Sequence, residues 1–404
     1  MPNISLRATA LPSSPIRKLV DYAIEAERKG LTVHYLNIGQ PDVESPAAFW
    51  EAVSTARIKT LAYSHSAGIP PLRDAVSADY RRIGIDVQSK DLLVTTGGSE
   101  ATLMTFLACF DPGDEVIVME PFYANYAGFA VVAGLSLVPL TTRIEEDFAL
   151  PPTSAIAAKI TPRTKGILLC NPSNPTGTVF SPAQLREIAS LAKERDLFLI
   201  VDEVYRDFFY GGQELLSVLN IPGLEENAIM LDSVSKKFSL CGARIGFLVT
   251  RNAAVINSAL KYGQARLASP TLDQIGAANC FEKTPASYFE NVRAEYMARR
   301  DMVVSELSKM PGVVCPTING AFYAIARLPV DDTDKFCEWL IREFSYEGQT
   351  VLLAPASGFY VTPGLGKQEV RIAYVIEKER IRAAMQVLAA ALEAYPARLV
   401  GARK

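Results

Sequence analysis

The sequence predicts an α/β fold in which a large domain with a mostly parallel sheet is joined to a smaller α+β domain. Three observations support this prediction. The chain has 404 residues, and a single hydrophobic core usually stops growing well below that length, so we expect two domains. From residue 92, short apolar runs alternate with longer amphipathic ones, which is typical of parallel sheets. After about residue 285, strands and helices follow one another in a pattern that favours an α+β domain.

The first expected element is an N-terminal helix. It starts at Ser13 or Ser14, before Pro15, and its apolar positions continue at helical spacing to a stop at Gly30. The apolar runs that we interpret as buried strands are 92–96, 115–119, 165–170, 197–202, 227–232 and 244–250. Between them, a crossover helix is expected over 181–196, because Ser181 and Gln184 match a capping box.

The expected smaller domain begins with a long charged helix after residue 285. The elements expected after that helix are strands 313–318 and 321–328, helix 332–344, strand 370–376 and a final helix from about 378. We expect residues 40–285 to form the large domain, and residues 1–39 and 286–404 to form the small one.

Composition excludes several classes of function. The 41 Lys and Arg are spread among 44 Asp and Glu, so no basic stripe indicates a nucleic-acid partner. The chain has no signal-peptide core and no apolar run of membrane-spanning length, so we expect a soluble, cytoplasmic protein without a membrane partner. The two histidines and six cysteines lack ligand spacing, so we expect free thiols and no metal site.

The stretch 232–246, Asp-Ser-Val-Ser-Lys-Lys-Phe-Ser-Leu-Cys-Gly-Ala-Arg-Ile-Gly, is the most informative part of the chain. The hydroxyls of Ser233 and Ser235 and the guanidinium of Arg244 can converge on one phosphate through charge-assisted hydrogen bonds. A lysine beside them can bond an aldehyde if its surroundings keep it neutral. Lys236 is the candidate and Lys237 is its rival, while the alternative is a solvated lysine pair at the end of a strand.

Ser-x-Ser-Lys followed by Gly-x-Arg-x-Gly resembles the cofactor-lysine signature of class I and II aminotransferases, which are fold type I enzymes dependent on pyridoxal 5'-phosphate (PLP). The resemblance implies a seven-stranded, mostly parallel sheet between helices in the large domain. It also implies that Lys236 carries PLP as a Schiff base, that Ser233, Ser235 and Arg244 bind its phosphate, and that Lys237 is a bystander.

Four other segments resemble the family in the same order along the chain. Thr95–Ala101 joins a strand to a helix through Gly97-Gly98, and such a turn lets backbone N–H groups approach an anion. The cofactor-binding residues that the resemblance implies are Gly98, Ser99, Glu100, Tyr123 against the ring, Asn174 and Tyr205 at the phenolic oxygen, and Asp202 at the ring nitrogen. Relatives often carry Gln at the position of Glu100. From the local pattern alone, Asp202 is equally well a helix N-cap.

On the substrate side, a bidentate arginine can hold the α-carboxylate of an amino acid. Arg371, within the apolar strand 370–376, resembles the arginine with this role, and Gly39 and Asn174 join it as expected substrate-binding residues. The alternative for Arg371 is a charge on an edge strand. Either Gln264 or Arg266 corresponds to the family's reader of the substrate side chain. Tyr63 resembles a tyrosine that reaches the phosphate in the partner's site, which implies a homodimer with shared active sites.

The predicted function is therefore amino transfer between an L-amino acid, with aspartate among the candidates, and a 2-oxo acid. Lys236, Asp202 and Tyr205 are the expected catalytic residues, and ping-pong kinetics are expected. One alternative is a PLP-dependent carbon–sulfur β-lyase of the same fold. Another is a non-catalytic PLP-binding regulator, but the chain lacks the N-terminal segment that such a regulator would need for DNA binding.

Overall fold

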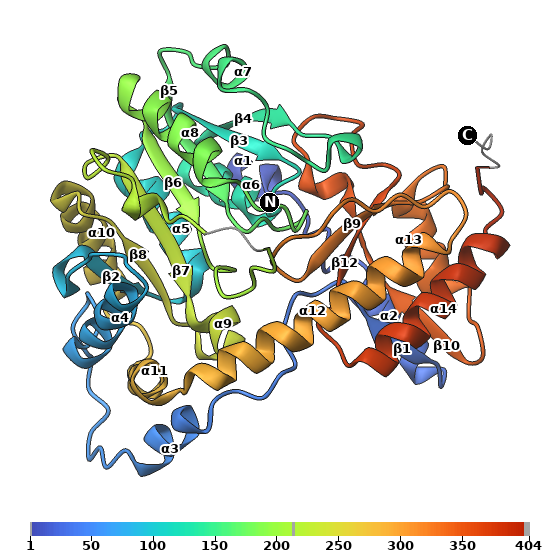
Figure 1. The fold of residues 1–404 in the computed structure, drawn as a ribbon, viewed down its shortest axis with the longest axis horizontal. Helices are drawn as coiled ribbons and strands as arrows, with labels where there is room; N and C mark the ends of the chain where they lie inside the picture. The colour runs from blue at the N-terminus through green and yellow to red at the C-terminus, as the bar shows by residue number, and fades with distance from the viewer. Residues whose placement is uncertain (1, 212–214, 400–404) are drawn as a thin grey trace.

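A seven-stranded sheet is the largest sheet in the computed structural model, which describes residues 2–211 and 215–399 (Figure 1). The strands lie in the order β2-β8-β7-β6-β5-β3-β4. Their bounds are Leu92–Thr95 (β2), Glu115–Glu120 (β3), Ser136–Thr141 (β4), Thr164–Cys170 (β5), Phe198–Asp202 (β6), Ala228–Ser233 (β7) and Gly246–Val249 (β8). All neighbours run parallel except β8, which is antiparallel to β2 and β7. The expected mostly parallel, seven-stranded sheet is confirmed.

Helices cover both faces of this sheet. Alternate residues of each strand point to opposite faces, and because both sets are apolar, both faces need a covering layer. Leu168 and Ile200 belong to the apolar core shared with α5, α6 and α10. Ile167 and Leu199 belong to the core on the other face, shared with α4, α8 and α11. The helices of this region are Ala47–Thr55 (α3), Pro70–Arg82 (α4), Gly97–Cys109 (α5), Asn125–Ala133 (α6), Thr153–Ala157 (α7), Pro182–Glu194 (α8), Val234–Lys237 (α9), Ala253–Arg266 (α10) and Thr271–Lys283 (α11).

Most of the remaining elements build a second core. Its strands are Thr32–Tyr35 (β1), Tyr323–Arg327 (β9), Gln349–Leu352 (β10), Ala354–Pro355 (β11) and Glu369–Ala373 (β12). Strand β1 pairs parallel with β10, and β11, β12 and β9 form an antiparallel sheet. The helices are Val20–Arg28 (α2), Ala286–Ser308 (α12), Thr333–Arg342 (α13) and Lys378–Ala394 (α14). The short helix Leu6–Ala10 (α1) buries no residue and contacts α6 instead. Figure 1 shows α12 as the long helix that runs from the large sheet to this second core.

Several expected elements differ from the structure. The N-terminal helix was placed too early, because Pro15–Leu19 forms hydrogen-bonded turns and α2 begins only at Val20. Strand 313–318 is reduced to a single bridge between Val314 and Arg327. Strand β4 was missed because Pro139 interrupts it, which an edge strand tolerates since one of its sides needs no hydrogen bonds. By contrast, the Ser181–Gln184 capping box at the start of α8 is confirmed.

Among the described residues, no helix combines the length and the apolar character needed to cross a membrane.

Candidate active site

A cavity of about 570 Å³ lies where the carboxyl ends of β5, β6 and β7 face the second core. Its size suits a cofactor together with a small substrate. The predicted site residues that line it are Gly39, Gly98, Ser99, Tyr123, Asn174, Asp202, Tyr205, Ser233, Ser235, Lys236, Arg244 and Arg371. Residues from distant parts of the sequence thus meet at the sheet edge where open α/β folds bind ligands.

Lys236 lies in the short helix α9, directly after β7. Its Nζ donates a hydrogen bond to the carbonyl oxygen of Gly39 at 2.7 Å and lies 3.4 Å from the sulfur of Cys241. Burial lowers the pKa of Lys236, Cys241 opposes this shift, and the charges of Arg371 and Arg244 lower the pKa further. The lysine therefore becomes a neutral nucleophile at a lower pH than an exposed lysine does.

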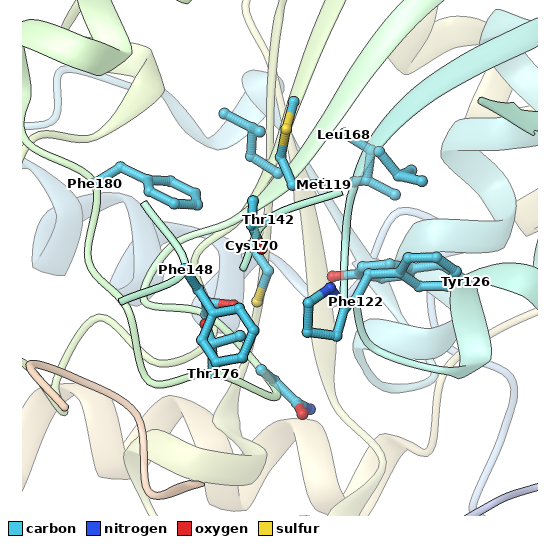
Figure 2. A pocket seen from close by; sticks show the side chains of 14 residues that line it. Met119, Phe122, Tyr126, Thr142, Phe148, Leu168, Cys170, Thr176 and Phe180 are labelled. Carbon is cyan, nitrogen blue, oxygen red and sulfur yellow. The ribbon is translucent and has the colours of Figure 1, made fainter. Parts of the chain in front are cut away.

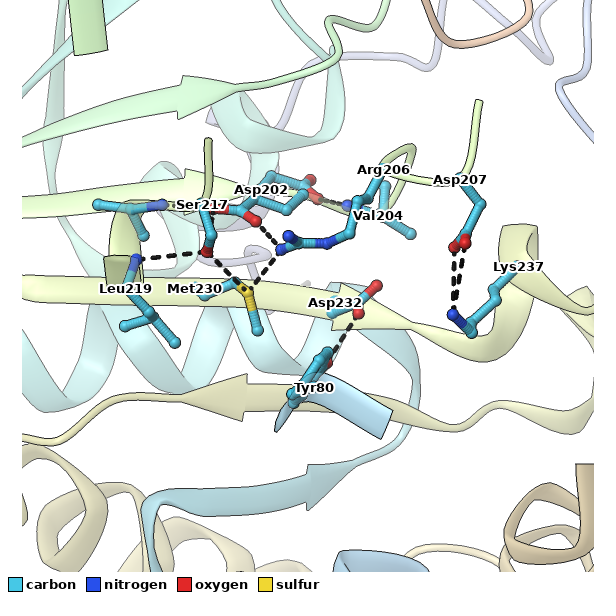
Figure 3. A network of polar contacts seen from close by, with 12 residues as sticks. Tyr80, Asp202, Val204, Arg206, Asp207, Ser217, Leu219, Met230, Asp232 and Lys237 are labelled. Atoms are coloured by element: carbon cyan, nitrogen blue, oxygen red, sulfur yellow. Dashed lines mark hydrogen bonds and ion pairs between the residues drawn. The ribbon is translucent and has the colours of Figure 1, made fainter. Parts of the chain in front are cut away.

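Lys237 points away from the cavity, toward the polar cluster in Figure 3. Its Nζ lies 3.1 Å from Asp79 and 3.4 Å from Asp207. Burial opposes the charge of Lys237, but the carboxylates of Asp207, Asp79 and Asp232 outweigh it and raise the pKa. The two neighbouring lysines thus have opposite environments, and only Lys236 has its amine in the cavity.

The hydroxyls of Ser233 and Ser235 lie 2.8 Å apart in the cavity wall. Arg244 has a left-handed backbone and donates a hydrogen bond to the carbonyl oxygen of Cys241 at 2.9 Å. Beside them is the N-terminus of α5, whose first-turn N–H groups have no partner within the helix. Gly97 has a φ of +77°, which residues with a side chain rarely adopt, and a Cβ there would lie 2.3 Å from Nη2 of Arg244, so glycine is favoured at this position. Hydroxyls, a guanidinium and a helix N-terminus together suit a phosphate.

Asp202 ends β6 with its carboxylate inside the cavity. The hydroxyl of Tyr126 donates to it at 2.6 Å, and the backbone N–H of Val204 donates at 3.2 Å. Burial raises the pKa of Asp202, although these two hydrogen bonds and the charge of Lys236 lower it in part. A cationic ring nitrogen would compensate a buried carboxylate of this kind.

Arg371 of β12 is fully buried and faces the cavity. Its Nη1 donates to the side-chain oxygen of Asn174 at 3.0 Å, and its Nη2 donates to the carbonyl oxygen of Asn37 at 2.5 Å. The guanidinium lies 4.4 Å from the ring centroid of Tyr323, while its Nε has no hydrogen-bond partner. The edge-strand alternative is therefore wrong, because β12 is the middle strand of its sheet and the arginine is buried.

Tyr205 and Asn174 form a second polar group in the cavity. The amide of Asn174 donates to the Tyr205 hydroxyl at 3.3 Å, and the hydroxyls of Tyr205 and Tyr323 lie 2.9 Å apart. A Cβ on Gly39 would lie 1.8 Å from the Tyr323 hydroxyl oxygen, which explains the need for glycine at that position. These hydroxyl and amide donors suit a phenolic oxygen.

Two predicted site residues, Glu100 and Tyr63, do not line the cavity. The Glu100 carboxylate accepts a hydrogen bond from the Thr96 N–H at 2.5 Å and pairs with Arg266 at 3.2 Å. Tyr63 is 82% exposed. Of the two candidate readers of the substrate side chain, Arg266 is thus engaged by Glu100, and Gln264 is exposed on α10. Roles for these residues stay predictions.

A second, much smaller pocket lies behind Cys170 and Asn174 (Figure 2). It has a volume of about 20 Å³ and is lined largely by apolar side chains such as Met119, Phe122 and Phe180. This volume holds about one water molecule and no substrate.

The sequence did not single out several residues that line the cavity or orient its groups: Ile16, Arg17, Asn37, Tyr126, Cys241 and Tyr323. Tyr126 lies three positions after the predicted site residue Tyr123, and its hydroxyl was a usable signal for a partner of Asp202. Arg17 and Tyr323 reach the cavity only through tertiary packing, which leaves no local pattern in the sequence.

The chain matches the family model "Aminotransferase class I and II" over residues 32–388. It is 30% identical to an aspartate aminotransferase of Pyrococcus horikoshii, over 96% of this chain and 97% of the relative. It is 33% identical to a valine–pyruvate aminotransferase of Mycobacterium tuberculosis, over 85% and 87% of the two chains. A solved structure of Thermus thermophilus aspartate aminotransferase with maleate superposes with a TM-score of 0.87 at 29% identity, over 97% of this chain and all of the other. The chain therefore belongs to the class I and II aminotransferases and is a PLP-dependent transaminase.

Proposed function

We propose that the cavity around Lys236 is the transamination site and that each lining residue has a separate role. Ser233, Ser235, Arg244 and the N-terminus of α5 would hold the phosphate of PLP. Asp202 would pair with the ring nitrogen, while Tyr205 and Asn174 would donate to the phenolic oxygen. These residues fit the charges of the cofactor. The buried carboxylate of Asp202 suits the cationic ring nitrogen, and the guanidinium and hydroxyl groups suit the anionic phosphate.

When bound, PLP supplies an electron sink for the α-carbon of the amino acid. Arg371 holds the α-carboxylate and thereby orients the bond to be broken. Lys236, as a neutral amine, takes the α-proton and returns it as a general acid. Asp202 keeps its buried negative charge opposite the ring nitrogen. Asn174 orients both Arg371 and Tyr205 through hydrogen bonds at 3.0 and 3.3 Å.

The observation that carries this proposal is the meeting of Lys236, Asp202, Arg244 and Arg371 in one cavity, although up to 169 positions of chain separate them. Tyr123 also lines the cavity and would lie against the ring. Glu100 contributes its backbone at the start of α5.

We further infer two domains and a homodimer. Residues 40–285 would form the large domain, and residues 1–39 and 286–404 the small one; the pairing of β1 with β10 and the packing of α2 on α13 support this division. The exposed ring of Tyr63 would reach the phosphate of the partner's site. The six free cysteines support a cytoplasmic location, where thiols stay reduced.

Lys236→Ala tests the proposal, with Lys237→Ala as the matched control. Without Lys236, the near-visible absorbance of lysine-bound PLP and all conversion of amino acids should be lost, whereas Lys237→Ala should keep the absorbance. Retention of absorbance and turnover by Lys236→Ala would refute the site. Release of pyruvate and ammonia without an added 2-oxo acid would instead favour the β-lyase reaction.

The names of the relatives leave the substrate open, since they include aspartate, prephenate, aromatic and valine–pyruvate aminotransferases. The substrate preference of this protein must therefore be inferred from the residues that line its own cavity.

A further inference from the structure

The charged residues that line the cavity are Arg17, Asp202, Lys236, Arg244 and Arg371. The roles proposed above give an anion to two of the three arginines. Arg244 receives the cofactor phosphate and Arg371 receives the α-carboxylate, while Asp202 faces a cationic nitrogen and Lys236 acts as a neutral amine. Arg17 is left as a cation in the wall of the site without an assigned anion.

The backbone around Arg17 is held close to Arg371. The amide of Asn37 donates to the carbonyl oxygen of Ile16 at 2.6 Å, and the carbonyl oxygen of Asn37 accepts from Nη2 of Arg371 at 2.5 Å. A turn further fixes the segment, since the Arg17 N–H donates to the Ser14 carbonyl oxygen and the Arg17 carbonyl oxygen accepts from the Val20 N–H. The position of Arg17 relative to the α-carboxylate site is thus set by hydrogen bonds.

The side chain of Arg17 is exposed, and within residues 2–211 and 215–399 it forms no ion pair. Its neighbour Lys18 differs, because Lys18 pairs with Asp334 of α13 and does not line the cavity. The charge of Arg17 also acts on the site, since it contributes to lowering the pKa of Arg371 after the larger effect of burial. Arg17 and Arg371 repel each other, and binding of a substrate with two carboxylates would neutralise both charges.

The other candidate reader, Arg266, is already neutralised within the subunit. Its Nη1 lies 3.2 Å from Glu100 and also contacts Thr96 and Ser269. A substrate carboxylate would have to compete with Glu100 for this guanidinium. Arg17 has no such competitor among the described residues.

We propose that Arg17 binds the second carboxylate of an acidic amino acid, and that this chain therefore prefers dicarboxylic amino acids and 2-oxo acids over their uncharged isosteres. This inference rests on the proposed function, because it takes Arg371 as the α-carboxylate site. It assigns substrate choice to the N-terminal segment of the same subunit.

The test compares substrate pairs that differ only in charge: aspartate with asparagine, and glutamate with glutamine. In single half-reactions followed by the cofactor spectrum, the wild-type protein should convert the acids more efficiently than the amides. Arg17→Gln should lower kcat/KM for the acids by roughly 10- to 100-fold, the usual range for one charge-assisted hydrogen bond, and leave the amides nearly unchanged. Arg17→Lys should lose less, because it keeps the charge. Lys18→Gln, which removes the adjacent charge, should leave the acid-to-amide ratio unchanged.

Equilibrium binding gives a second readout. Maleate should bind the wild-type protein more tightly than isocrotonate, in which a methyl group replaces one carboxylate, and Arg17→Gln should abolish this difference in calorimetry. Equal losses for acids and amides, or a wild-type preference for amides, would overturn the role of Arg17 while leaving transamination intact. Failure of every amino acid to change the cofactor spectrum would instead overturn the proposed function.

Discussion

At the level of single residues, the contrast between Lys236 and Lys237 shows how position sets chemistry. The two side chains are adjacent in sequence and both are buried, yet burial at Lys236 is reinforced by two arginines, whereas burial at Lys237 is outweighed by three carboxylates. Their pKa values consequently move in opposite directions, and only the first favours a neutral amine. The Ser-x-Ser-Lys pattern, through its resemblance to the family signature, predicted that Lys236 faces the cavity. The groups that shift the pKa of Lys236 could be identified only from the structure.

Cys241 offers a pH-dependent test of this environment. Burial lowers the pKa of Lys236, and the Cys241 sulfur at 3.4 Å opposes that shift. Cys241→Ala removes the opposing effect, so the pKa should fall further and the neutral amine should persist to lower pH. The acidic limb of the half-reaction rate should therefore move to lower pH, while Cys241→Ser should move it less. An acidic limb that moves to higher pH in Cys241→Ala would contradict this account of Lys236.

Asp202→Asn tests the buried carboxylate. The amide keeps the size of the side chain but cannot hold a cationic ring nitrogen, so the half-reaction should slow by roughly 100-fold or more, as expected for loss of a buried charged hydrogen bond. Circular dichroism should be unchanged. Asp207→Asn, which removes a carboxylate that faces Lys237 outside the cavity, should keep the half-reaction rate. Equal effects of the two substitutions would argue against a specific role for Asp202.

At the level of elements, the phosphate cradle depends on the contact between β8 and the start of α5. A Cβ on Gly246 would lie 2.3 Å from the backbone carbon of Gly97, whereas a Cβ on Gly242 would meet nothing within 4 Å. The resemblance of 232–246 to a family signature located both glycines, but only the packing shows which one is required.

Gly246→Ala should therefore destabilise the protein and weaken PLP binding, and Gly242→Ala is its matched control. Backbone must move to accommodate the new methyl group, so we expect a loss of about 1–3 kcal/mol in the free energy of unfolding. Urea unfolding and spectroscopic titration with PLP measure the two effects. Since Gly242 has an ordinary backbone conformation and no protein atom within 4 Å of a Cβ, its alanine variant should keep the wild-type free energy of unfolding; because Gly242 lines the cavity, it is a control for unfolding and not for PLP binding. Equal behaviour of the two variants would show that the β8–α5 contact is adaptable.

Most buried strands of the large sheet and the helices α5, α8, α12, α13 and α14 were predictable from the sequence, because apolar runs and caps are local signals. The capping box of α8 and the apolar runs of β5 and β6 are examples. Strands β1 and β10 were not predicted, since they are short and gain their stability by pairing with each other across more than 300 residues. The resemblance to the family pointed to most of the residues that line the cavity, but not to Arg17, whose location depends on how the N-terminal turn packs.

At the level of the whole molecule, the exposed ring of Tyr63 bears on the proposed homodimer. Tyr63 is 82% exposed and Leu61 is 60% exposed, so the ring is free to reach a second subunit. If Tyr63 of each subunit completes the other's phosphate site, every active site draws Lys236 from one chain and Tyr63 from the other.

Mixed dimers test this sharing. Tyr63→Phe dimers should have weakened PLP binding in both sites, and Lys236→Ala dimers should have no activity. When the two proteins exchange subunits, one site of each hybrid combines an intact Lys236 from the first chain with an intact Tyr63 from the second. The hybrid should therefore regain about half of the wild-type activity per dimer at PLP concentrations that leave Tyr63→Phe largely empty, because one of its two sites is complete. If activity in the mixture stays at the simple average of the two parent proteins after subunit exchange is verified, Tyr63 acts within its own subunit or not at all.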